Sequence, residues 1–435
     1  MDFFDKRILI LGGGSSGSSA SEVLKSLGTQ TFLINDTRTV ILENDFLRGF
    51  DECVISPGIS IRDINVLKCL ENNVKVISEL ELGYSLNNSR LIGVTGTNGK
   101  TTTVSLISKI LTDTGINNEP LGNIGTPFSS KALKYGKDDI LPIEVSSFQL
   151  EAIHNFRPNI AVITNITPDH LDRHLTMQNY IDCKMKIFSN QTKSDFAVIN
   201  YDQPEILPYF KPNSIKLFIS TKQKVQGAYS LNGRMYIDGK YLMRTNELKI
   251  IGIHNVYNVL IAGLCAYLCG VDFDTIRQSI KEFLGVKHRL QYVGTLDKIN
   301  FLNDSKATNP NAAIVAIKSM KIPTVLILGG SDKGLGFLEF FADIKQNYKN
   351  IKYIVICGAV KQRMLDAVAA CGLNPKTVEA NNFTDAFYKS IELAQSIQPC
   401  NILLSPACAS FDEFVNFEAR GQRFVELVKN LITKT

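Results

Sequence analysis

The sequence lacks the features that would place the chain outside a reducing compartment or on a nucleic acid. Its nine cysteines are scattered along 435 residues without a C-x-x-C pair, which is typical of free thiols. No apolar segment with a small-residue cleavage site stands at the amino terminus, so no signal peptide is expected. The net charge is only +5 and the basic residues are not clustered, which argues against nucleic-acid binding. We therefore expect a cytoplasmic protein.

Long hydrophobic runs are also absent from the sequence. The most apolar stretch, residues 256–271, is shorter than the ~20 residues that span a bilayer, and Asn258 lies near its start. We expect a core helix over this stretch and no membrane span.

Strand-like and helix-like patterns alternate along almost the whole chain, which predicts an α/β protein with mostly parallel sheets. A length of 435 residues exceeds what one hydrophobic core usually serves. We predict three α/β domains, over residues 1–88, 89–288 and 289–435, of which the first and the last are Rossmann-like. Within the middle domain, the turn at 231–234 is expected to join the strands of a hairpin.

A glycine pattern follows the first predicted strand. Gly12, Gly14 and Gly17 match G-x-G-x-x-G, and Asp36 lies about 20 residues further on, at the end of the next strand. This geometry is typical of a dinucleotide site, so a nicotinamide-dependent oxidoreductase is one hypothesis and a turn without a ligand is another. The first hypothesis is weakened because the other reactive residues indicate phosphate and magnesium chemistry.

The segment GVTGTNGKTTTV, residues 93–104, departs by one position from the strict phosphate-loop pattern, which would place a glycine where Val94 stands. A strand pattern precedes it and a helix pattern follows, so N–H groups from Gly96 onward are expected to converge at a helix N-terminus. Lys100 would reach the terminal phosphates, and the Thr101 hydroxyl suits Mg²⁺. We interpret the segment as a phosphate loop, so the domain over 89–288 is predicted to be a P-loop-type ATPase domain; the alternative is a solvated turn.

Three further side chains are candidates near that loop. Glu144 lies in an apolar strand that should end at the same sheet edge, so it is a candidate magnesium ligand. His170 and His174 are four residues apart, but no H-E-x-x-H glutamate lies between them, so a zinc protease is not indicated. Each histidine alone is equally compatible with a capping or core role. Lys184 lies on a predicted amphipathic helix, where a surface position is the simplest interpretation.

Together these motifs resemble the Mur ligase family, the ATP-dependent amide-forming enzymes of bacterial peptidoglycan synthesis. The motifs occur in this order: TGTNGKT (95–101), EVSSFQLE (144–151), NITPDHLDRH (165–174), KMK (184–186), HN (254–255), HR (288–289), NDSKATNP (303–310), LGGSDKG (328–334) and LLSPACASFDEFVNFEARG (403–421). The resemblance covers essentially the whole chain. Within the family it is strongest to members that add D-glutamate to UDP-N-acetylmuramoyl-L-alanine.

The resemblance implies a mechanism. The substrate carboxylate attacks the γ-phosphate of ATP, an acyl phosphate and ADP form, and the amine of D-glutamate then displaces phosphate. It also implies two Mg²⁺ sites, a carbamylated Lys184 and a monomer. The catalytic residues would be Lys100, Lys184, His170 and Lys306.

The resemblance further implies binding roles for individual residues. ATP would contact Gly96, Thr97, Asn98, Gly99, Lys100, Thr101, Thr102, Asn258, Arg289 and Asp304, with His288 beside them. The metal ligands would be Thr101, Glu144, His170 and carbamylated Lys184. The UDP-linked substrate would contact Ser15, Ser16, Asp36, Thr37, Arg38, Asn123, Ser146 and Ser147. D-Glutamate would contact Lys306, Thr308, Lys333, Ser410 and Phe417.

One residue departs from the family pattern, because Gln291 stands where glutamate is common. Several alternatives remain: a family member with another amino-acid acceptor, a folate polyglutamate synthase, and a regulatory nucleotide-binding protein that forms no bond. The layout also predicts closure of the last domain over ATP, with hinges near 88–90 and 287–290.

Overall fold

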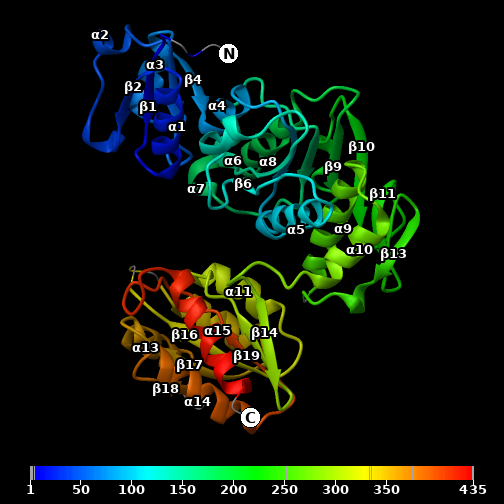
Figure 1. Cartoon of the computed structure of the whole chain (residues 1–435). Coiled ribbons are helices and arrows are strands. Elements are labelled where there is room, and N and C mark those ends of the chain that lie inside the picture. Colours follow the sequence, from blue (N-terminus) through cyan, green and yellow to red (C-terminus); the bar gives the residue numbers. More distant parts are fainter. Residues whose placement is uncertain are drawn as a thin grey trace. The chain divides into compact units, whose positions relative to one another are not determined.

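The computed structural model describes residues 3, 5–250, 252–332, 334, 336–373 and 376–433 (Figure 1). Contacts group the chain into two compact units, Met1–Leu248 with Ile253–Phe283, and Lys249–Gly252 with Leu284–Thr435. The first unit contains a four-stranded and a nine-stranded sheet, and the second contains a six-stranded sheet. The α/β class with mostly parallel strands is confirmed.

The first sheet is fully parallel, in the order β2-β1-β3-β4. Its strands are β1 (Arg7–Leu11), β2 (Gln30–Ile34), β3 (Glu52–Ile55) and β4 (Lys75–Ser78), and its helices are α1 (Ser15–Ser26), α2 (Asn44–Leu47), α3 (Ile64–Glu71) and α4 (Glu79–Ser85). Ile8 and Ile10 belong to one buried cluster and Leu9 and Leu11 to another, so β1 is buried on both faces. This explains why its sequence is apolar without alternation.

The nine-stranded sheet has the order β13-β12-β11-β10-β9-β8-β5-β7-β6. Its strands are β5 (Arg90–Thr95), β6 (Leu121–Gly122), β7 (Ile140–Glu144), β8 (Ile160–Ile163), β9 (Phe196–Asn200), β10 (Ile215–Ser220), β11 (Gly227–Leu231), β12 (Arg234–Ile237) and β13 (Lys240–Arg244). Its helices are α5 (Lys100–Asp113), α6 (Ser147–Leu150), α7 (Leu171–His174), α8 (Met177–Met185), α9 (Ile253–Leu268) and α10 (Phe273–Glu282). In this order, all neighbouring strands from β11 through β5 to β6 run parallel to one another.

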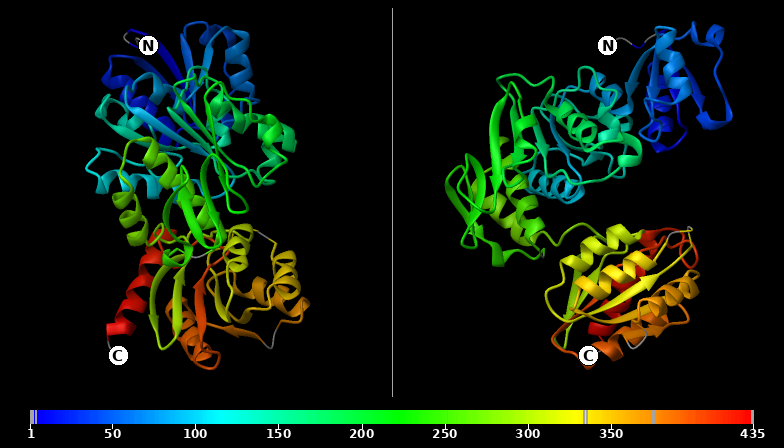
Figure 2. Two further views of the ribbon diagram at one scale, coloured as in Figure 1. Left: turned by 90° about the vertical axis from the view of Figure 1, so that its right-hand side faces the viewer. Right: turned by 180° about the vertical axis from the view of Figure 1, so that it is seen from behind.

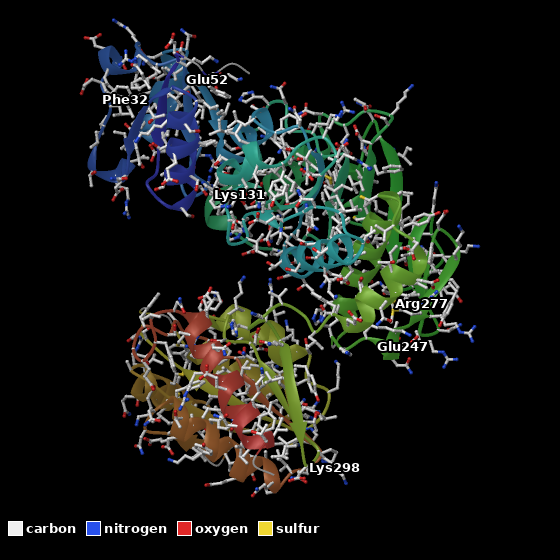
Figure 3. All side chains as sticks on the ribbon, in the orientation of Figure 1. Phe32, Glu52, Lys131, Glu247, Arg277 and Lys298 are labelled. Carbon is white, nitrogen blue, oxygen red and sulfur yellow. The ribbon has the colours of Figure 1, made fainter. Side chains whose placement is uncertain are left out.

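The far end of this sheet turns antiparallel through the predicted hairpin. Leu231 pairs with Arg234, and Asn232 and Gly233 have φ of +50° and +71°. Two positive φ values match a tight hairpin turn, so this prediction is confirmed. The green strands β11–β13 lie beside the yellow-green helices α9 and α10 (Figure 2). Arg277 of α10 donates to the carbonyl of Leu242 at 2.7 Å across this contact (Figure 3).

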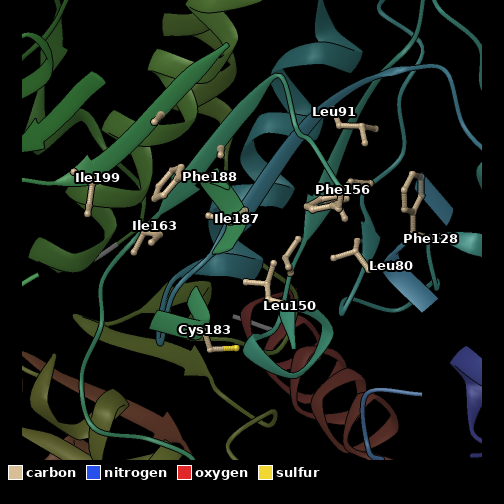
Figure 4. Packing of buried hydrophobic residues seen from close by; sticks show 14 of the residues in the cluster. Leu80, Leu91, Phe128, Leu150, Phe156, Ile163, Cys183, Ile187, Phe188 and Ile199 are labelled. Carbon is tan, nitrogen blue, oxygen red and sulfur yellow. The ribbon is translucent and has the colours of Figure 1, made fainter. Parts of the chain in front are cut away.

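One hydrophobic core joins elements from both sides of residue 88. Leu80 of α4, which follows the first sheet, belongs to the same buried cluster as Phe128, Phe156 and Ile163 of the central region (Figure 4). The stretch predicted as a core helix forms α9, which is buried along most of its length. No helix in the described part of the chain has the length and apolarity that crossing a membrane requires.

The sheet of the second unit has the order β14-β15-β19-β16-β17-β18, in which the pair β14–β15 is antiparallel and the other pairs are parallel. Its strands are β14 (Gln291–Leu296), β15 (Ile299–Asn303), β16 (Thr324–Gly329), β17 (Ile351–Cys357), β18 (Thr377–Glu379) and β19 (Cys400–Leu404). Its helices are α11 (Pro310–Lys318), α12 (Leu338–Asn347), α13 (Lys361–Ala370), α14 (Phe383–Gln395) and α15 (Phe417–Thr433). Each of the three sheets lies within one predicted domain, and the boundaries themselves stay a prediction.

The third glycine of the fingerprint is fixed by close packing of α1 on the preceding turn. A Cβ on Gly17 would lie 1.9 Å from the carbonyl oxygen of Gly12, whereas a Cβ on Gly14 would meet nothing within 4 Å. The Gly12 oxygen belongs to the backbone, and a Cβ would be attached directly to the backbone of α1. Neither atom could therefore move away without a shift of the helix or of the turn.

We predict that Gly17→Ala lowers the free energy of unfolding by about 1–3 kcal/mol, although alanine is ordinarily the better helix former. Urea unfolding of Gly17→Ala and Gly14→Ala, compared with the wild type, measures this. Equal stability of the two variants would contradict the packing explanation.

Candidate active site

The phosphate loop runs from Thr95, where β5 ends, to Lys100, where α5 begins. Gly96 has φ of +143° and Gly99 has φ of +86°, so two glycines make the turn without the one missing from the strict pattern. At Gly99 a Cβ would lie 2.4 Å from Oδ1 of Asn258. Glycine is therefore required at that position both by backbone conformation and by space.

The segment after β8 holds this loop in place. The amide of Thr97 donates to the carbonyl of Asn165 at 2.8 Å, and that of Asn98 donates to the Asn165 side chain at 3.0 Å. The hydroxyl of Thr164 donates to the carbonyl of Asn98 at 2.6 Å. Since β5 and β8 are parallel neighbours, the loops after them meet at one edge, as the sequence predicts.

Three predicted nucleotide contacts lie at the start of α5. The ammonium of Lys100 donates to the carbonyls of Gly96 and Thr97, at 2.8 and 2.9 Å, so it lies folded over its own loop. Thr101 and Thr102 are buried in the first turn of the helix, where backbone N–H groups lack intrahelical partners. Positive charge and the helix dipole therefore favour an anion at the same place.

Asn258, a further predicted ATP contact, lies on the helix α9. It is buried on α9 behind the loop, where its side chain accepts from the Thr103 hydroxyl at 3.3 Å and donates to Asn255 at 3.0 Å. It supports the back of the loop, and its contact with a nucleotide stays a prediction.

Lys184 is a buried lysine, so the surface interpretation is wrong. Its side chain is almost fully enclosed, its Nζ donates to the carbonyl of Gly96 at 2.9 Å, and it lies 4.7 Å above the ring of Tyr180. Burial, followed by the positive charge of Lys100, lowers the pKa of Lys184 to about 7. A large fraction of this amine is therefore neutral, and nucleophilic, at neutral pH.

Tyr180 contacts both the phosphate loop and Lys184, and the sequence analysis missed it. It lies one helical turn before Lys184 on α8, and its hydroxyl is 3.1 Å from Oγ1 of Thr97. Burial raises the pKa of Tyr180 to about 12, so the hydroxyl stays neutral. The spacing Tyr180-x-x-x-Lys184 in an amphipathic helix was the available signal.

Glu144 ends β7 directly beside the phosphate loop, since it pairs in register with Val94 of β5. It is buried; Oε1 accepts from Nδ2 of Asn123 at 3.1 Å, and Oε2 has no hydrogen-bond partner among the described residues. A buried carboxylate oxygen without a partner is unfavourable unless a cation compensates it. The donor set therefore fits a hard divalent cation. Asn123 therefore positions Glu144, and its predicted contact with the substrate stays a prediction.

The two histidines of the DHLDRH segment have different environments. His170 has φ of +52° and a half-exposed ring, which packs on Phe148 with 4.8 Å between centroids. His174 is buried, its Nε2 is 3.0 Å from the Ser147 hydroxyl, and burial lowers its pKa. His170 is thus available to a ligand, whereas His174 is a core residue. The described residues contain no ready group of three or more His, Cys, Asp or Glu side chains for a metal.

The predicted substrate residue Ser146 caps α6. Its hydroxyl and its backbone amide both bond to the side chain of Gln149, each at 3.0 Å. This capping box fixes the turn that follows Glu144.

The glycine-rich turn of the first sheet leads into α1, where Ser15 and Ser16 occupy the first helical positions. Asp36 and Arg38 form a two-point ion pair at 2.9 Å for each contact, and hydrogen bonds from Arg38 lower the pKa of Asp36 to about 2. Thr37 is buried and its hydroxyl donates to Asp63 at 2.8 Å. The turn and this ion pair lie after neighbouring strands, β1 and β2.

In the second unit, Asp304 follows β15 and is buried. Its carboxylate accepts from the Ser405 hydroxyl at 2.7 Å and from the amide of Leu290 at 3.1 Å, next to Arg289. Burial raises the pKa of Asp304 to about 7. Gln291 accepts from the amide of His288 at 2.9 Å, so its role here is to hold the turn that carries Arg289.

Four of the five predicted D-glutamate residues are described, and they lie on loops after β15 and β19 and at the start of α15. Nζ of Lys306 lies 5.9 Å from the ring centre of Phe417, and Thr308 follows on the same loop. Ser410 is buried, and its hydroxyl has no hydrogen-bond partner among the described residues. Lys333 lies outside the described residues.

A buried arginine that the sequence analysis missed joins these loops. Arg420 donates to the hydroxyl and carbonyl of Ser305, each at 3.0 Å, and to the carbonyls of Cys408 and Ala409 at 2.9 and 3.1 Å. Its planar guanidinium fixes the spacing of two loops at the edge of the sheet. The motif NFEARG was recognised, but nothing local indicated that Arg420 points inward.

Two parts of the chain match family models: the Mur ligase middle domain over residues 94–266, and the Mur ligase, glutamate ligase domain over 288–408. The chain is 36% identical to the UDP-N-acetylmuramoylalanine--D-glutamate ligase of Caldanaerobacter subterraneus, over 99% of this chain and 100% of that protein. It is 37% identical to the protein of the same name from Pelotomaculum thermopropionicum, over 99% of each. The chain belongs to the Mur ligase family.

Solved structures of Mur ligases share the fold at much lower identity. MurC from Thermotoga maritima is 18% identical with a TM-score of 0.58, over 98% of this chain and 99% of that one. MurF from Acinetobacter baumannii is 16% identical with a TM-score of 0.60, over 88% of this chain and 86% of that one. Family membership does not favour the nicotinamide-dependent oxidoreductase hypothesis.

Glu144→Gln tests the cation site. The amide preserves the shape of the side chain and removes its charge, so Mn²⁺ affinity in the presence of a non-hydrolysable ATP analogue should fall at least ~10-fold. Electron paramagnetic resonance of free Mn²⁺ measures this.

Glu79→Gln is the matched control. Glu79 is also buried, and its Oε2 has no hydrogen-bond partner among the described residues, but its Oε1 accepts from the amide of Ser129 and burial raises its pKa. This variant should keep wild-type Mn²⁺ affinity. An equal loss in both variants would show that Glu144 acts only through the packing of the fold.

Proposed function

We propose that this protein joins D-glutamate to UDP-N-acetylmuramoyl-L-alanine at the expense of ATP, yielding ADP and phosphate, in the synthesis of peptidoglycan precursors. The observation that carries the proposal is the similarity, over 99% of the chain, to relatives named for this reaction. The phosphate loop, the buried lysine and the unpartnered carboxylate at one sheet edge support it, because they supply the charges that phosphoryl transfer needs.

The first step is attack of the substrate carboxylate on the γ-phosphate. Lys100 leaves the carbonyls of Gly96 and Thr97 and meets the phosphates, while the first N–H groups of α5, those of Lys100, Thr101 and Thr102, face them. When bound, Mg²⁺ neutralises phosphate charge and leaves the carboxylate less repelled. Thr101, Glu144, His170 and carbamylated Lys184 are the residues that would hold two such ions. The amine of D-glutamate then attacks the acyl phosphate and phosphate leaves.

The environment of Lys184 supports the proposed carbamylation. Carbon dioxide adds to a neutral amine: the nitrogen lone pair forms the new N–C bond, one proton leaves to solvent, and the side chain becomes an anion. With a pKa of about 7 in the folded protein, the amine is protonated below pH 7 and becomes competent as pH rises through that value. The resulting anion would offset the charge of Lys100 and of a metal ion.

The remaining predicted contacts divide between the two units. In the first unit, Ser15, Ser16, Asp36, Thr37 and Arg38 would hold the UDP group, with Asn123 and Ser146 toward the muramoyl part. In the second unit, Arg289 and Asp304 would contact the nucleotide, and Lys306, Thr308, Lys333, Ser410 and Phe417 would hold D-glutamate. We further propose that the protein acts as a monomer in the cytoplasm.

The acceptor is tested by phosphate release from ATP with UDP-N-acetylmuramoyl-L-alanine and a panel of D- and L-amino acids. We expect turnover with D-glutamate and little with L-glutamate or diamino acids. Turnover with a diamino acid but not with D-glutamate would assign a different acceptor. ATP binding without phosphate release for any acceptor would indicate a regulatory protein.

Lys184→Ala tests the carbamate. We expect the variant to lose most of its activity and to recover part of it with added acetate or formate. The wild-type protein should require bicarbonate, and this requirement should be weakest above pH 7. Lys186→Ala is the control, because Lys186 is exposed on the same segment and donates only to the carbonyl of Glu151. Full activity of Lys184→Ala without added carboxylate would refute the carbamate role.

A further inference from the structure

Arg173 joins the two sheets of the first unit through its guanidinium. The side chain is only 11% exposed and belongs to α7, three residues after His170. Nη1 donates to the carbonyl of Pro57 at 2.7 Å, and Nη2 donates to the carbonyl of Ile59 at 2.8 Å. Both carbonyls belong to the loop that follows β3 of the first sheet. One side chain of the central region thus fixes two backbone positions of the other sheet.

Residues of the central region also hold the guanidinium of Arg173 in place. Nε and Nη2 donate to the two carboxylate oxygens of Glu151, at 3.1 and 2.5 Å, and the group lies 4.0 Å from the ring centre of Phe148. Phe148 is also the ring on which His170 packs. Arg62, in turn, donates to the carbonyl of Arg173 at 2.9 Å. Arg173 therefore cannot shift without moving the surroundings of His170.

The loop after β3 also supports the glycine-rich turn. The hydroxyl of Ser56 donates to the carbonyl of Gly12 at 2.8 Å, and the amide of Ser56 donates to Leu11 at 2.9 Å. A Cβ on Gly12 would lie 2.9 Å from that of Ser56, so the two segments are in close contact. In the order β2-β1-β3-β4, this contact lies between β1 and β3, where the strand order reverses and ligands of such sheets bind.

We propose that Arg173 is a positioning residue that couples occupancy of the glycine-rich turn, by the diphosphate of a nucleotide-linked substrate, to the placement of His170 at the metal site. The inference rests on the function proposed above. The connected groups run from Gly12 through Ser56 and the carbonyls of Pro57 and Ile59 to Arg173, and from there through Phe148 to His170. The coupling is reciprocal, because linkage requires that metal–nucleotide binding strengthen substrate binding by the same factor.

The test measures that factor. Calorimetry gives the Kd of UDP-N-acetylmuramoyl-L-alanine with and without Mg²⁺ and a non-hydrolysable ATP analogue, for wild type and for Arg173→Lys. A lysine keeps the charge but cannot reach four acceptors at once. We expect a ratio of Kd values of at least ~5 in the wild type, within the usual range of coupling, and a ratio below ~2 in the variant. Affinity for the analogue alone should not change.

Arg157→Lys is the matched control. Arg157 also donates through Nε to a carboxylate, that of Asp195 at 2.8 Å, and its Nη2 donates to Thr192 and Ser194, so its described hydrogen bonds stay within the central region of the same unit. It should keep the wild-type ratio. A folded Arg173→Lys protein with the wild-type ratio would overturn the inference, as would a wild type that binds the substrate without coupling.

Two other outcomes are decided in advance. A wild type that does not bind UDP-N-acetylmuramoyl-L-alanine at all contradicts the proposed function itself. If Arg173→Lys does not fold, Ser56→Ala replaces it, because this substitution removes the bond from the Ser56 hydroxyl to the carbonyl of Gly12, the first link between the turn and the loop after β3. A ratio reduced at least twofold in Ser56→Ala supports the coupling, and an unchanged ratio overturns it.

Discussion

The hydrogen bond from Lys184 to the carbonyl of Gly96, made from inside the protein, is the interaction around which the central region is organised. It places a buried amine directly under the phosphate loop and brings α8 to the end of β5. Tyr180 follows on the same helix and reaches Thr97 of the loop. A buried cation next to Lys100 is unfavourable on its own, so this arrangement has a chemical purpose only when anions occupy the loop.

Two sheets of parallel strands supply the geometry on which that interaction depends. The carboxyl ends of β5, β7 and β8 lie at one edge, which gathers the phosphate loop, Glu144 and the segment leading to His170. The first sheet presents its own glycine-rich turn, and Arg173 connects the two within one unit. In the second unit, too, a buried arginine connects loops at the ends of parallel strands, because Arg420 holds the loops that follow β15 and β19.

The sequence predicted those parts of the site that depend on local order along the chain. The phosphate loop follows from a strand, glycines, a lysine and a helix in succession, and the position of Glu144 follows because parallel strands end at the same edge. Burial of Lys184 did not follow, since an amphipathic helix does not reveal which polar residue faces inward. Arg173 was also missed, because its acceptors lie 114 and 116 residues earlier in the chain. Asn258 and Asn123 bond to protein groups in the structure, and their predicted ligand contacts stay predictions.

The central claim is that the protein activates a carboxylate by phosphorylating it. The most direct test uses UDP-N-acetylmuramoyl-L-alanine labelled with ¹⁸O in its terminal carboxylate, followed by mass spectrometry of the phosphate released with D-glutamate. An acyl phosphate intermediate transfers one labelled oxygen to each phosphate, so the account predicts one ¹⁸O atom per phosphate. Unlabelled phosphate, formed at the same rate as the amide product, would contradict it.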